Sequence, residues 1–551
     1  MRHIADRVSE LQHAFWTGEI SRNELLSRAA KLGVSASVLA TLPTIGVTPA
    51  LAAGRAASPS KSPVTFVWAD NQEPTSADPH LAQDTSSFSL VRNVYEPLVE
   101  IDPATLTLIP RLATSWKVLG NTWTFKLRSG VLFHDGSKFD ASAAYQSISR
   151  CLSINQGAAF LIHDIESMKV VDPGTLKITT KGPSPYLPAH LVKIGIISPA
   201  AIKQHAQGND LAQHWLSTNA VGTGPYIMQP WQHGSRLTLT KNTHWWHPWH
   251  AGSIDTVIFD PTTDTTVRME KLQRGTADFV AWAPLNEAVR VGKTSGFHLH
   301  VTKTFDSDPV LYLNTKKPPL DNVLVRQALQ YIFDYGAVRS YYQNYASIPT
   351  GPIPADFPTG LKGLPPFRQD FAKAKSLLDQ AHVSPSSIKL DFVVPAGFAE
   401  FAFGATAFQA AAQKLGITVN VITTPWAQML AQYSSLKTSA HITDFAQSPF
   451  SLDPTSFMTS FYQTGAVYNM SKVSDPRIDR LLTMATQSFS LADQAKYMGQ
   501  AQKIVHDMAA CVWGCRPQTV DAVPNYVKGY VMDRTDYRWA MKFYLLSIAH
   551  H

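Results

Sequence analysis

A histidine stands directly before an aspartate in the stretch "LRSGVLFHDGSKF", at His134 and Asp135. A His–Asp pair can activate the nucleophile of a hydrolase when the carboxylate orients the imidazole. Adjacent side chains of an extended chain point to opposite faces, so Asp135 cannot readily orient its neighbour. Asp135-Gly136 is also a typical turn dipeptide. We therefore interpret the pair as structural and predict no catalytic role for it.

Other motifs of catalysis are missing from the sequence. There is no G-x-S-x-G and no H-E-x-x-H, and "GKT" at Gly292–Thr294 lacks the earlier glycine of a phosphate-binding loop because Glu287 stands there. No set of nucleophile and base presents itself. We predict no catalytic residues and no cofactor, and a secreted hydrolase is the alternative from another class.

Three histidines, His244, His247 and His250, recur at every third position among the tryptophans of "THWWHPWH". Imidazoles are common metal ligands, so a metal site is one interpretation of this spacing. Pro248 breaks the helical register that would bring the histidines to one face. We favour a structural role for this stretch and predict no metal site.

The cysteines are Cys151, Cys511 and Cys515. Four residues of extended chain span about 13 Å, so the last two cannot form a disulfide unless the chain turns at Gly514. Both outcomes stay open for that pair. Cys151 is expected to be a buried small apolar residue.

The composition is that of a globular protein with more than one domain. The chain has 551 residues, 44% of them hydrophobic and 16% charged, and its net charge of +7 comes from 48 basic and 41 acidic residues. The basic residues form no run, which argues against nucleic acid as a partner. A chain of this length exceeds a single core and predicts about two to four domains.

The N-terminal segment has the pattern of an export signal. Arg22, Arg28 and Lys31 precede an apolar stretch of small residues, and Ala50-Leu51-Ala52 is an A-x-A cleavage site. The apolar stretch is interrupted too often to span a membrane. "SRNELL" looks like a twin-arginine signal in which Asn23 replaces the second arginine, so the export route stays open.

Strands and helices are expected to position these residues. "TSWKVLGNTWTFKL" predicts a hairpin with Trp123, Phe125 and Leu127 on one face, and "FDASAAYQSISR" predicts a helix capped by Asp140 or Ser142. Later helices and strands alternate with short loops, which predicts βαβ layers. The expected buried helical positions are Val325, Ala328, Leu329 and Ile332, then Phe371, Ala374, Leu377 and Leu378 after the cap Asp370. A further helix ends at Gly416 before a strand through Val419 and Val421.

Several stretches follow one another in a specific order: "YEPLVEIDPATLTLIPRLATSWKV", "WTFKLRSGVLFHDGSKFDAS", "GTGPYIM", "NTHWWH", "LQRGTADFV", "PPLDNVLVRQALQYIFD", "DFAKAKSLLDQA" and "DPRIDRLL". In this order they closely resemble the solute-binding proteins of the peptide, opine and nickel ABC importers, from about Val64 to His551. The resemblance implies an α/β, two-lobed periplasmic-binding-protein fold (class II, large type) with an extra β-rich domain. It also implies that the segment around His134 lies in that extra domain and does no chemistry.

The resemblance predicts how the chain divides. The expected parts are a signal peptide (1–52), a linker (53–63), lobe I in three pieces (64–95, 218–306 and 517–551), the extra β-rich domain (96–217) and lobe II (307–516). In the family the ligand lies in the cleft between the lobes.

Candidate cleft residues follow from the resemblance position by position. The loop after "DPH" makes Gln83 and Thr85 candidates, Trp426 matches a tryptophan that stacks on the ligand, and Arg516 and Asn469 are further candidates. The first two could instead be turn residues, Trp426 a core tryptophan and Arg516 a solvated charge.

The family also suggests how a peptide's amine is read. Dipeptide- and oligopeptide-binding relatives carry an Asp three residues before an acidic-Pro pair, and it holds the peptide ammonium. Here the pair is Asp453-Pro454 and the matching residue is Phe450, which cannot form that charge-assisted hydrogen bond. Asp444, six residues earlier, is the nearest substitute unless it has a structural role. We therefore expect a ligand that is recognised without a free N-terminal amine.

Together these observations predict an exported, monomeric, non-catalytic receptor in the periplasm. It would capture short peptides or another small solute and deliver them to an ABC permease in the inner membrane. A non-peptide solute, such as an opine-like compound or a metal chelate, is the alternative ligand. The expected mechanism is closure of the lobes about two connecting strands, near Asp306 and Arg516.

Overall fold

The computed structural model describes residues 63–549, except 106, 304–307, 356, 358, 397–398, 434, 448–452, 467 and 533–539. The predicted signal peptide, and the predicted linker up to residue 62, lie outside the described residues. Among the described helices, none is long and apolar enough to cross a membrane.

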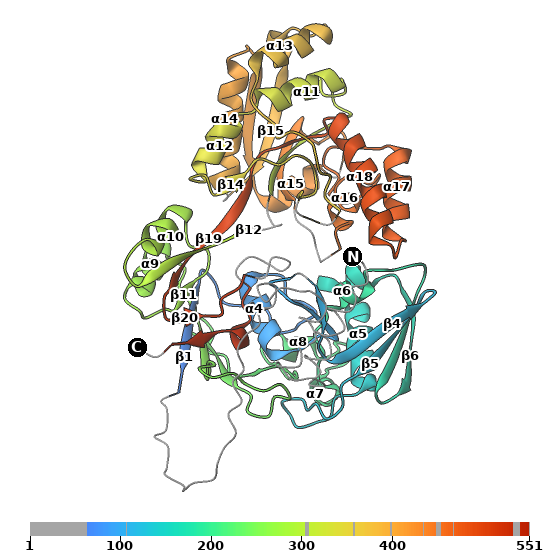
Figure 1. Ribbon diagram of the computed structural model, residues 1–551, viewed down its shortest axis with the longest axis vertical. Helices are drawn as coiled ribbons and strands as arrows, with labels where there is room; N and C mark the ends of the chain where they lie inside the picture. Colours follow the sequence, from blue (N-terminus) through green and yellow to red (C-terminus); the bar gives the residue numbers. More distant parts are fainter. Residues whose placement is uncertain are drawn as a thin grey trace, which may run out of the picture. The chain divides into compact units, whose positions relative to one another are not determined.

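Lobe I is built on a five-stranded sheet with the order β11-β1-β10-β9-β8 (Figure 1). β1 (Thr65–Asp70) is central and runs parallel to β10 (Thr256–Pro261) and β11 (Phe279–Val280). β9 (Leu237–Lys241) and β8 (Tyr226–Met228) continue the sheet as antiparallel strands. The carboxyl end of β1 therefore lies between two parallel neighbours.

Helices cover both faces of this sheet. Phe66 and Trp68 are buried against α4 (Thr85–Val94) and the C-terminal segment, and the opposite face packs on α9 (Thr265–Gln273) and α10 (Leu285–Gly292). A parallel strand with apolar residues on both faces has to be covered by helices on both faces of the sheet.

The extra domain contains a four-stranded antiparallel sheet with the order β4-β5-β7-β6. β4 (Ala113–Leu119) and β5 (Thr122–Leu127) form the predicted hairpin, and β6 (Ile165–Asp172) and β7 (Thr175–Thr180) form a second one. Trp123, Phe125 and Leu127, the residues predicted to share a face, are all buried in one cluster. This confirms the predicted alternation.

The helix predicted after this hairpin is α5 (Ala141–Ile154). Asp140 is its N-cap, because the carboxylate accepts a hydrogen bond from the Ala143 amide at 3.0 Å. Cys151 lies on the buried side of the helix with 0% of its surface exposed, as expected. α5 thus closes the apolar face of the four-stranded sheet.

Lobe II is built on a second five-stranded sheet with the order β16-β15-β17-β13-β18. Its strands are β13 (Asp308–Leu313), β15 (Lys389–Pro395), β16 (Thr418–Thr424), β17 (Ile442–Gln447) and β18 (Cys511–Trp513). β15 runs parallel to β16 and β17, whereas β13 is antiparallel to β17 and β18. The parallel pair β15 and β16, joined through α14, confirms the predicted βαβ unit.

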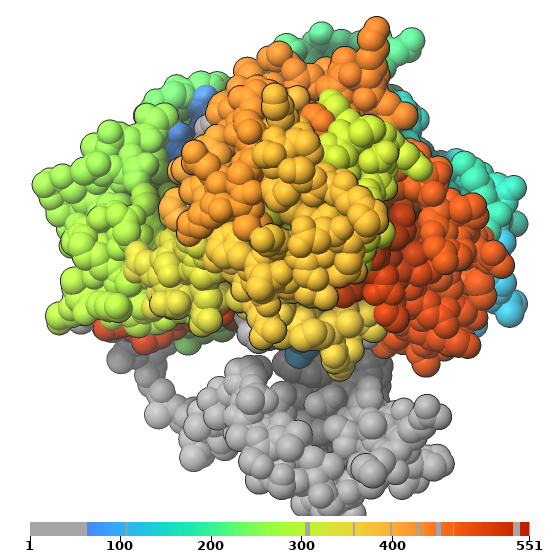
Figure 2. Space-filling view, turned by 90° about the horizontal axis from the view of Figure 1, so that it is seen from above, coloured from blue at the N-terminus to red at the C-terminus, as the bar shows by residue number. Residues whose placement is uncertain are grey.

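Two groups of helices cover the two faces of this sheet. The first group is α11 (Val323–Ile332), α12 (Tyr335–Tyr341), α13 (Phe371–Gln380) and α14 (Ala399–Gln413). The second group is α15 (Trp426–Tyr433), α16 (Ser456–Thr459), α17 (Pro476–Thr486) and α18 (Leu491–Asp507). Figure 2 looks onto this lobe, with the first group in colours from yellow-green to orange and α17 and α18 in red-orange.

The predicted helical stripes of lobe II are borne out with one exception. Every residue of the first stripe has 0% of its surface exposed. In the second stripe Phe371 is only partly buried, because it is the first residue of α13, directly after the cap Asp370. Gly416 ends the segment after α14 with φ +86°, a conformation that favours glycine.

Two antiparallel strands connect the lobes. β12 (Phe297–Lys303) leaves lobe I, and β19 (Arg516–Pro524) returns to it along the whole length of β12 (Figure 1). β14 (Ala346–Ser347) pairs with the start of β19. Asp306 lies outside the described residues, and the domain boundaries remain a prediction.

The remaining elements are short. They are β2 (Val99–Ile101), β3 (Leu108–Pro110), η1 (Gly157–Ile162), α6 (Leu187–Leu191), α7 (Pro199–His205), α8 (Gln213–Leu216), η2 (Pro385–Ser387), β20 (Val527–Lys528), η3 (Phe543–Leu545) and β21 (Ser547–Ile548).

The possible disulfide between Cys511 and Cys515 is not formed, and none of the three buried cysteines is disulfide-bonded. Cys511 packs with one helix group of lobe II and Cys515 with the other. Their side chains therefore fill the cores on opposite faces of the same sheet, which excludes a bridge between them.

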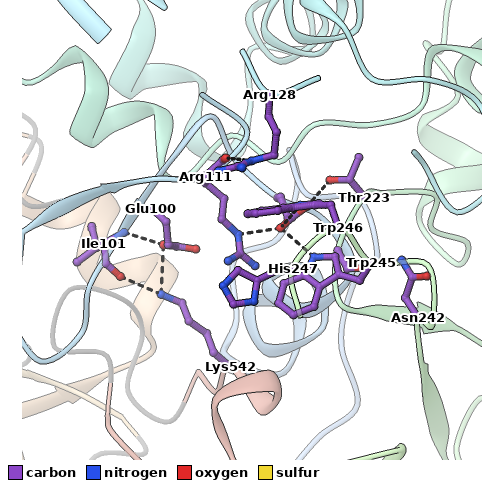
Figure 3. A network of polar contacts seen from close by, with 12 residues as sticks. Glu100, Ile101, Arg111, Arg128, Thr223, Asn242, Trp245, Trp246, His247 and Lys542 are labelled. Carbon is purple, nitrogen blue, oxygen red and sulfur yellow. Dashed lines mark hydrogen bonds and ion pairs between the residues drawn. The ribbon is translucent and has the colours of Figure 1, made fainter. Parts of the chain in front are cut away.

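A buried ionic network attaches the extra domain to lobe I (Figure 3). Glu96 accepts hydrogen bonds from the indoles of Trp245 at 3.2 Å and Trp246 at 2.9 Å, and pairs with Arg111 at 2.8 Å. The Arg111 guanidinium also lies 4.9 Å from the ring of Tyr544, near the C-terminus. The tryptophans of "THWWHPWH" thus hold the domain in place. The described residues contain no group of three or more His, Cys, Asp or Glu arranged to hold a metal.

The two most specific motifs of the resemblance contact each other. The His134 amide donates to the Gly222 carbonyl at 2.9 Å, and its Nε2 donates to the Gly224 carbonyl at 3.0 Å. The Gly224 amide donates to the Val94 carbonyl at 2.9 Å. A Cβ atom at Gly222 would lie 2.1 Å from the Val94 oxygen, so this approach requires glycine. "FHDG" and "GTGPY" together attach the extra domain to lobe I.

Asp135 does not orient His134, as predicted. Its carboxylate accepts hydrogen bonds from the Ser137 hydroxyl at 2.6 Å and the Ser198 hydroxyl at 2.5 Å. Although burial opposes the change, these hydrogen bonds lower the pKa of Asp135. Burial lowers the pKa of His134 to about 4, so the ring is neutral at pH 7. Both side chains therefore have structural partners, and the absence of a catalytic role stays a prediction.

A third attachment comes from the "DPH" loop. Arg150 of α5 donates two hydrogen bonds to Asp78, at 3.0 and 2.5 Å, and a third to Nδ1 of His80 at 2.9 Å. His80 Nε2 donates to the Gly195 carbonyl at 3.0 Å. Burial is the main reason that the pKa of His80 falls to about 4. Three buried networks therefore attach the extra domain to lobe I.

Candidate functional site

The loop after β1 brings two predicted ligand-binding residues to the start of α4. Asp84 is the N-cap, and its carboxylate accepts from the Ser87 amide at 2.8 Å and the Ser87 hydroxyl at 2.6 Å. Gln83 precedes the cap and is exposed, whereas Thr85 is the first helical residue and is buried. A solute that reaches this loop would therefore meet Gln83 first.

Asp70, the last residue of β1, is a site candidate that sequence reasoning missed. It lies at the carboxyl end of a central parallel strand, the edge at which open α/β sheets bind ligands. Burial raises the pKa of Asp70 to about 6, although the Ser86 hydroxyl donates to its carboxylate. The apolar run "TFVWAD" ending in a carboxylate is the signal that could have pointed to it.

Asp444 lies on β17, opposite Leu311 of β13. It shares a strand face with Ile442, and that face packs against the first helix group of lobe II. Only 1% of Asp444 is exposed, and no residue in the described part of the chain forms a hydrogen bond of normal geometry with its carboxylate. Burial, reinforced by the charge of Glu400 on α14, raises the pKa of Asp444 well above its usual range. The site therefore favours the neutral acid.

Asn469 shapes the loop that contains it. Its amide nitrogen donates to the carbonyls of Gln463 at 3.0 Å and Val473 at 2.7 Å, and its oxygen accepts from the Val473 amide at 3.0 Å. The side chain is buried. These three bonds use the polar groups that a ligand would need, so its predicted contact with ligand has little geometric support.

The other predicted residues are described only in part. Arg516 is partly buried at the first position of β19, opposite Ser347 of β14. Trp426 begins α15, but its side chain lies outside the described residues, and so does all of Phe450. The predicted set thus comes from both lobes and from the connection, and its sharing of one ligand remains a prediction.

Side chains of the extra domain also contact lobe II, which sequence reasoning did not anticipate. The three contacts join residues more than 250 positions apart, so no local pattern indicates them. The pairs are Tyr186–Gln494, through a hydrogen bond from the hydroxyl, His190–Asp453, with Nε2 3.6 Å from Oδ2, and Trp123–Phe489, with ring centroids 6.2 Å apart.

These features define a class of protein. Two lobes with open α/β sheets, joined by two strands, and an extra β-rich domain form the architecture of a periplasmic solute-binding protein. The chain belongs to the bacterial extracellular solute-binding proteins of family 5, whose model ("family 5 Middle") matches residues 107–469. It is therefore the substrate-binding component of an ABC transporter.

Individual relatives support this assignment over nearly the whole chain. The chain is 29% identical over 484 residues to the probable D,D-dipeptide-binding periplasmic protein DdpA of Escherichia coli strain K12. This alignment covers 84% of this chain and 90% of DdpA. It is 26% identical over 507 residues to heme-binding protein A of Haemophilus influenzae, and the alignment covers 87% of this chain and 92% of that protein.

Among solved structures, HbpA2 from Haemophilus parasuis matches with a TM-score of 0.78 at 24% identity and covers 88% of this chain and 100% of its own. This likeness shows the fold.

Proposed function

We propose that the protein is an exported, monomeric and non-catalytic receptor for a short peptide or a related small solute, and that it recognises this solute without a free N-terminal amine. The solute enters between the lobes, the lobes close about β12 and β19, and the closed form docks on the ABC permease. The names of two relatives mention a dipeptide and heme, so a non-peptide solute is the alternative ligand.

The state of Asp444 supports the amine-independent recognition. A carboxylate that receives a peptide ammonium has to be ionised and accessible, but Asp444 is buried in a site that favours the neutral acid. In the position that matches the family's amine-binding Asp the sequence has Phe450, and a phenyl ring offers at most a weaker cation–π contact. The free amine of a peptide therefore contributes little binding free energy in this protein.

Mass spectrometry of solutes that co-purify with the protein identifies the ligand class. Calorimetry with Ala-Phe and N-acetyl-Ala-Phe then tests the amine. We expect the two affinities to agree within about twofold, because no charge-assisted hydrogen bond is lost on acetylation. A loss of more than about tenfold on acetylation would overturn the proposal.

The variant Asp444→Asn separates the two causes of such a loss. If it weakens Ala-Phe as much as acetylation does, Asp444 receives the amine. If it has no effect, another group receives the amine, and Asp444 is not part of the site. Hydrolysis of Ala-Phe during a long incubation would instead support the secreted hydrolase.

A further inference from the structure

A pocket of about 510 Å³ lies where the extra domain meets lobe II, apart from the residues considered above. The extra domain contributes Phe160 of η1. Lobe II contributes residues from the end of α16 and the loop that follows it: Thr459, Ser460, Gln463, Thr464 and Tyr468. This volume falls within the range of small-molecule sites.

The lobe II wall of the pocket is fixed in place. The Tyr468 ring stacks on Phe445 of β17 at 5.5 Å and on Phe461 at 5.7 Å. The Thr464 amide donates to Asp479 of α17 at 2.9 Å, and the Asn469 side chain bonds across the loop as described above. The wall is therefore preformed, which lowers the cost of ordering it around a ligand.

The chemistry of the pocket is uncharged. None of its lining residues carries a formal charge, and the polar groups are hydroxyls, a carboxamide and the phenol of Tyr468. Phe160 presents a phenyl ring with 53% of its surface exposed. A neutral ring-bearing group would stack on that phenyl ring and hydrogen-bond to Gln463 or a hydroxyl. A charged group would lose hydration without gaining a counter-charge.

The pocket depends on the contact between the extra domain and lobe II. η1, which carries Phe160, packs against α6, which carries His190. His190 contacts Asp453, close before α16, and Thr459 ends α16. Because the extra domain is attached to lobe I, closing the lobes brings Phe160 to its place opposite Tyr468.

We propose that this pocket is a subsite, completed by lobe closure, for an uncharged aromatic side chain of the bound solute. The proposal rests on the proposed function, since it assigns the pocket to the same ligand. It predicts that the protein prefers solutes with a neutral ring over those with a methyl group in the same position.

The first test uses benzamide, a neutral ring with an amide, in an NMR binding titration. We expect saturable weak binding, reduced at least about threefold by Phe160→Ala, which removes the stacking surface. Tyr145→Ala, a similarly exposed aromatic residue on α5 that does not line the pocket, should leave binding unchanged. Absence of saturable binding, or equal effects of the two variants, would overturn the subsite.

The second test is calorimetry with N-acetyl-Ala-Phe and N-acetyl-Ala-Ala. Phe160→Ala should weaken the first by about three- to tenfold and change the second by less than about twofold. Equal weakening of both, or of neither, would contradict the subsite. If wild type binds benzamide through Phe160 but neither dipeptide, the subsite stands and the peptide part of the proposed function fails.

Discussion

His134 is hard to protonate in the folded protein. Its ring is buried, and no group in the described part of the chain accepts a hydrogen bond from Nδ1. Burial lowers its pKa from 6.5 to about 4. A pKa depressed by folding contributes stability that is present above the unfolded value, here 6.5, and is lost as the pH falls through about 4.

We expect His134→Gln to remove this part of the pH dependence, because glutamine can donate to the Gly224 carbonyl and does not titrate. Between pH 7 and pH 4 the free energy of unfolding of wild type should fall by on the order of 3 kcal/mol more than that of the variant. Urea unfolding at several pH values measures this. His214→Gln, on an exposed histidine, should keep the wild-type slope. Equal slopes for wild type and His134→Gln would refute the assignment.

Asp444 titrates in the opposite sense. Burial raises its folded-state pKa above 3.8, so the stability that the neutral acid provides is lost as the pH rises through the folded pKa. Asp444→Asn should therefore gain stability relative to wild type between pH 4 and pH 8. Asp379→Asn, on the exposed side of α13, is the control and should gain nothing. A variant that is less stable than wild type at pH 8 would show that Asp444 is an ionised, partnered carboxylate.

At the scale of elements, the Glu96–Arg111 pair joins the loop before β2 to the segment after β3 and to the tryptophans of lobe I. Side-chain exposure is 9% for Arg111 and 1% for Glu96, so removing the carboxylate leaves the Arg111 guanidinium buried without its ion-pair partner. We expect Glu96→Gln to cost about 3–5 kcal/mol of unfolding free energy. The double variant Glu96→Gln/Arg111→Met should recover part of this loss, because it removes both charges.

The control is an exposed pair at a similar distance. Glu270 of α9 and Arg274, the C-cap of that helix, lie 3.0 Å apart, with side chains more than half exposed. Glu270→Gln should cost less than about 1 kcal/mol, because water screens both charges. Denaturant unfolding measures the free energy of unfolding of the three variants. Equal losses for Glu96→Gln and Glu270→Gln would show that burial does not increase the contribution of the Glu96 ion pair to stability.

Sequence reasoning succeeded where the determinant was local. The β4–β5 hairpin follows from alternation, the start of α5 from the capping carboxylate of Asp140, and the buried stripe of α11 from helical periodicity. Each of these signals lies within about ten residues of chain, and the structure confirms them.

Long-range placement could not be predicted in this way. Trp246 and Glu96 are 150 residues apart, and Tyr186 and Gln494 are 308 residues apart. The opposite faces taken by Cys511 and Cys515 depend on the break between β18 and β19. The burial of Asp444 is likewise a property of the packed lobe, which a window of sequence does not contain.

At the scale of the whole molecule, we expect the N-terminal segment to direct export of the protein. Ala50-Leu51-Ala52 is the A-x-A site after a basic and an apolar region, so an export peptidase should cut behind it. N-terminal sequencing of the exported protein should begin near Ala53. Replacing Ala50 and Ala52 by Lys should abolish this cleavage. A full-length product that stays in the cytosol would contradict the export signal.

At the same scale, we expect the two lobes to close around the bound solute. Three buried networks attach the extra domain to lobe I, so we expect lobe II to move about β12 and β19. We expect small-angle scattering to show a smaller radius of gyration when the solute identified by mass spectrometry is added.

Tyr186→Phe/His190→Ala removes two contacts between the extra domain and lobe II, so this variant should be more expanded than wild type without solute and bind more weakly. Tyr145→Phe, on a residue outside these contacts, should match wild type. Identical scattering profiles with and without saturating solute would exclude hinge closure, and a double variant identical to wild type would show that these contacts do not hold the lobes together.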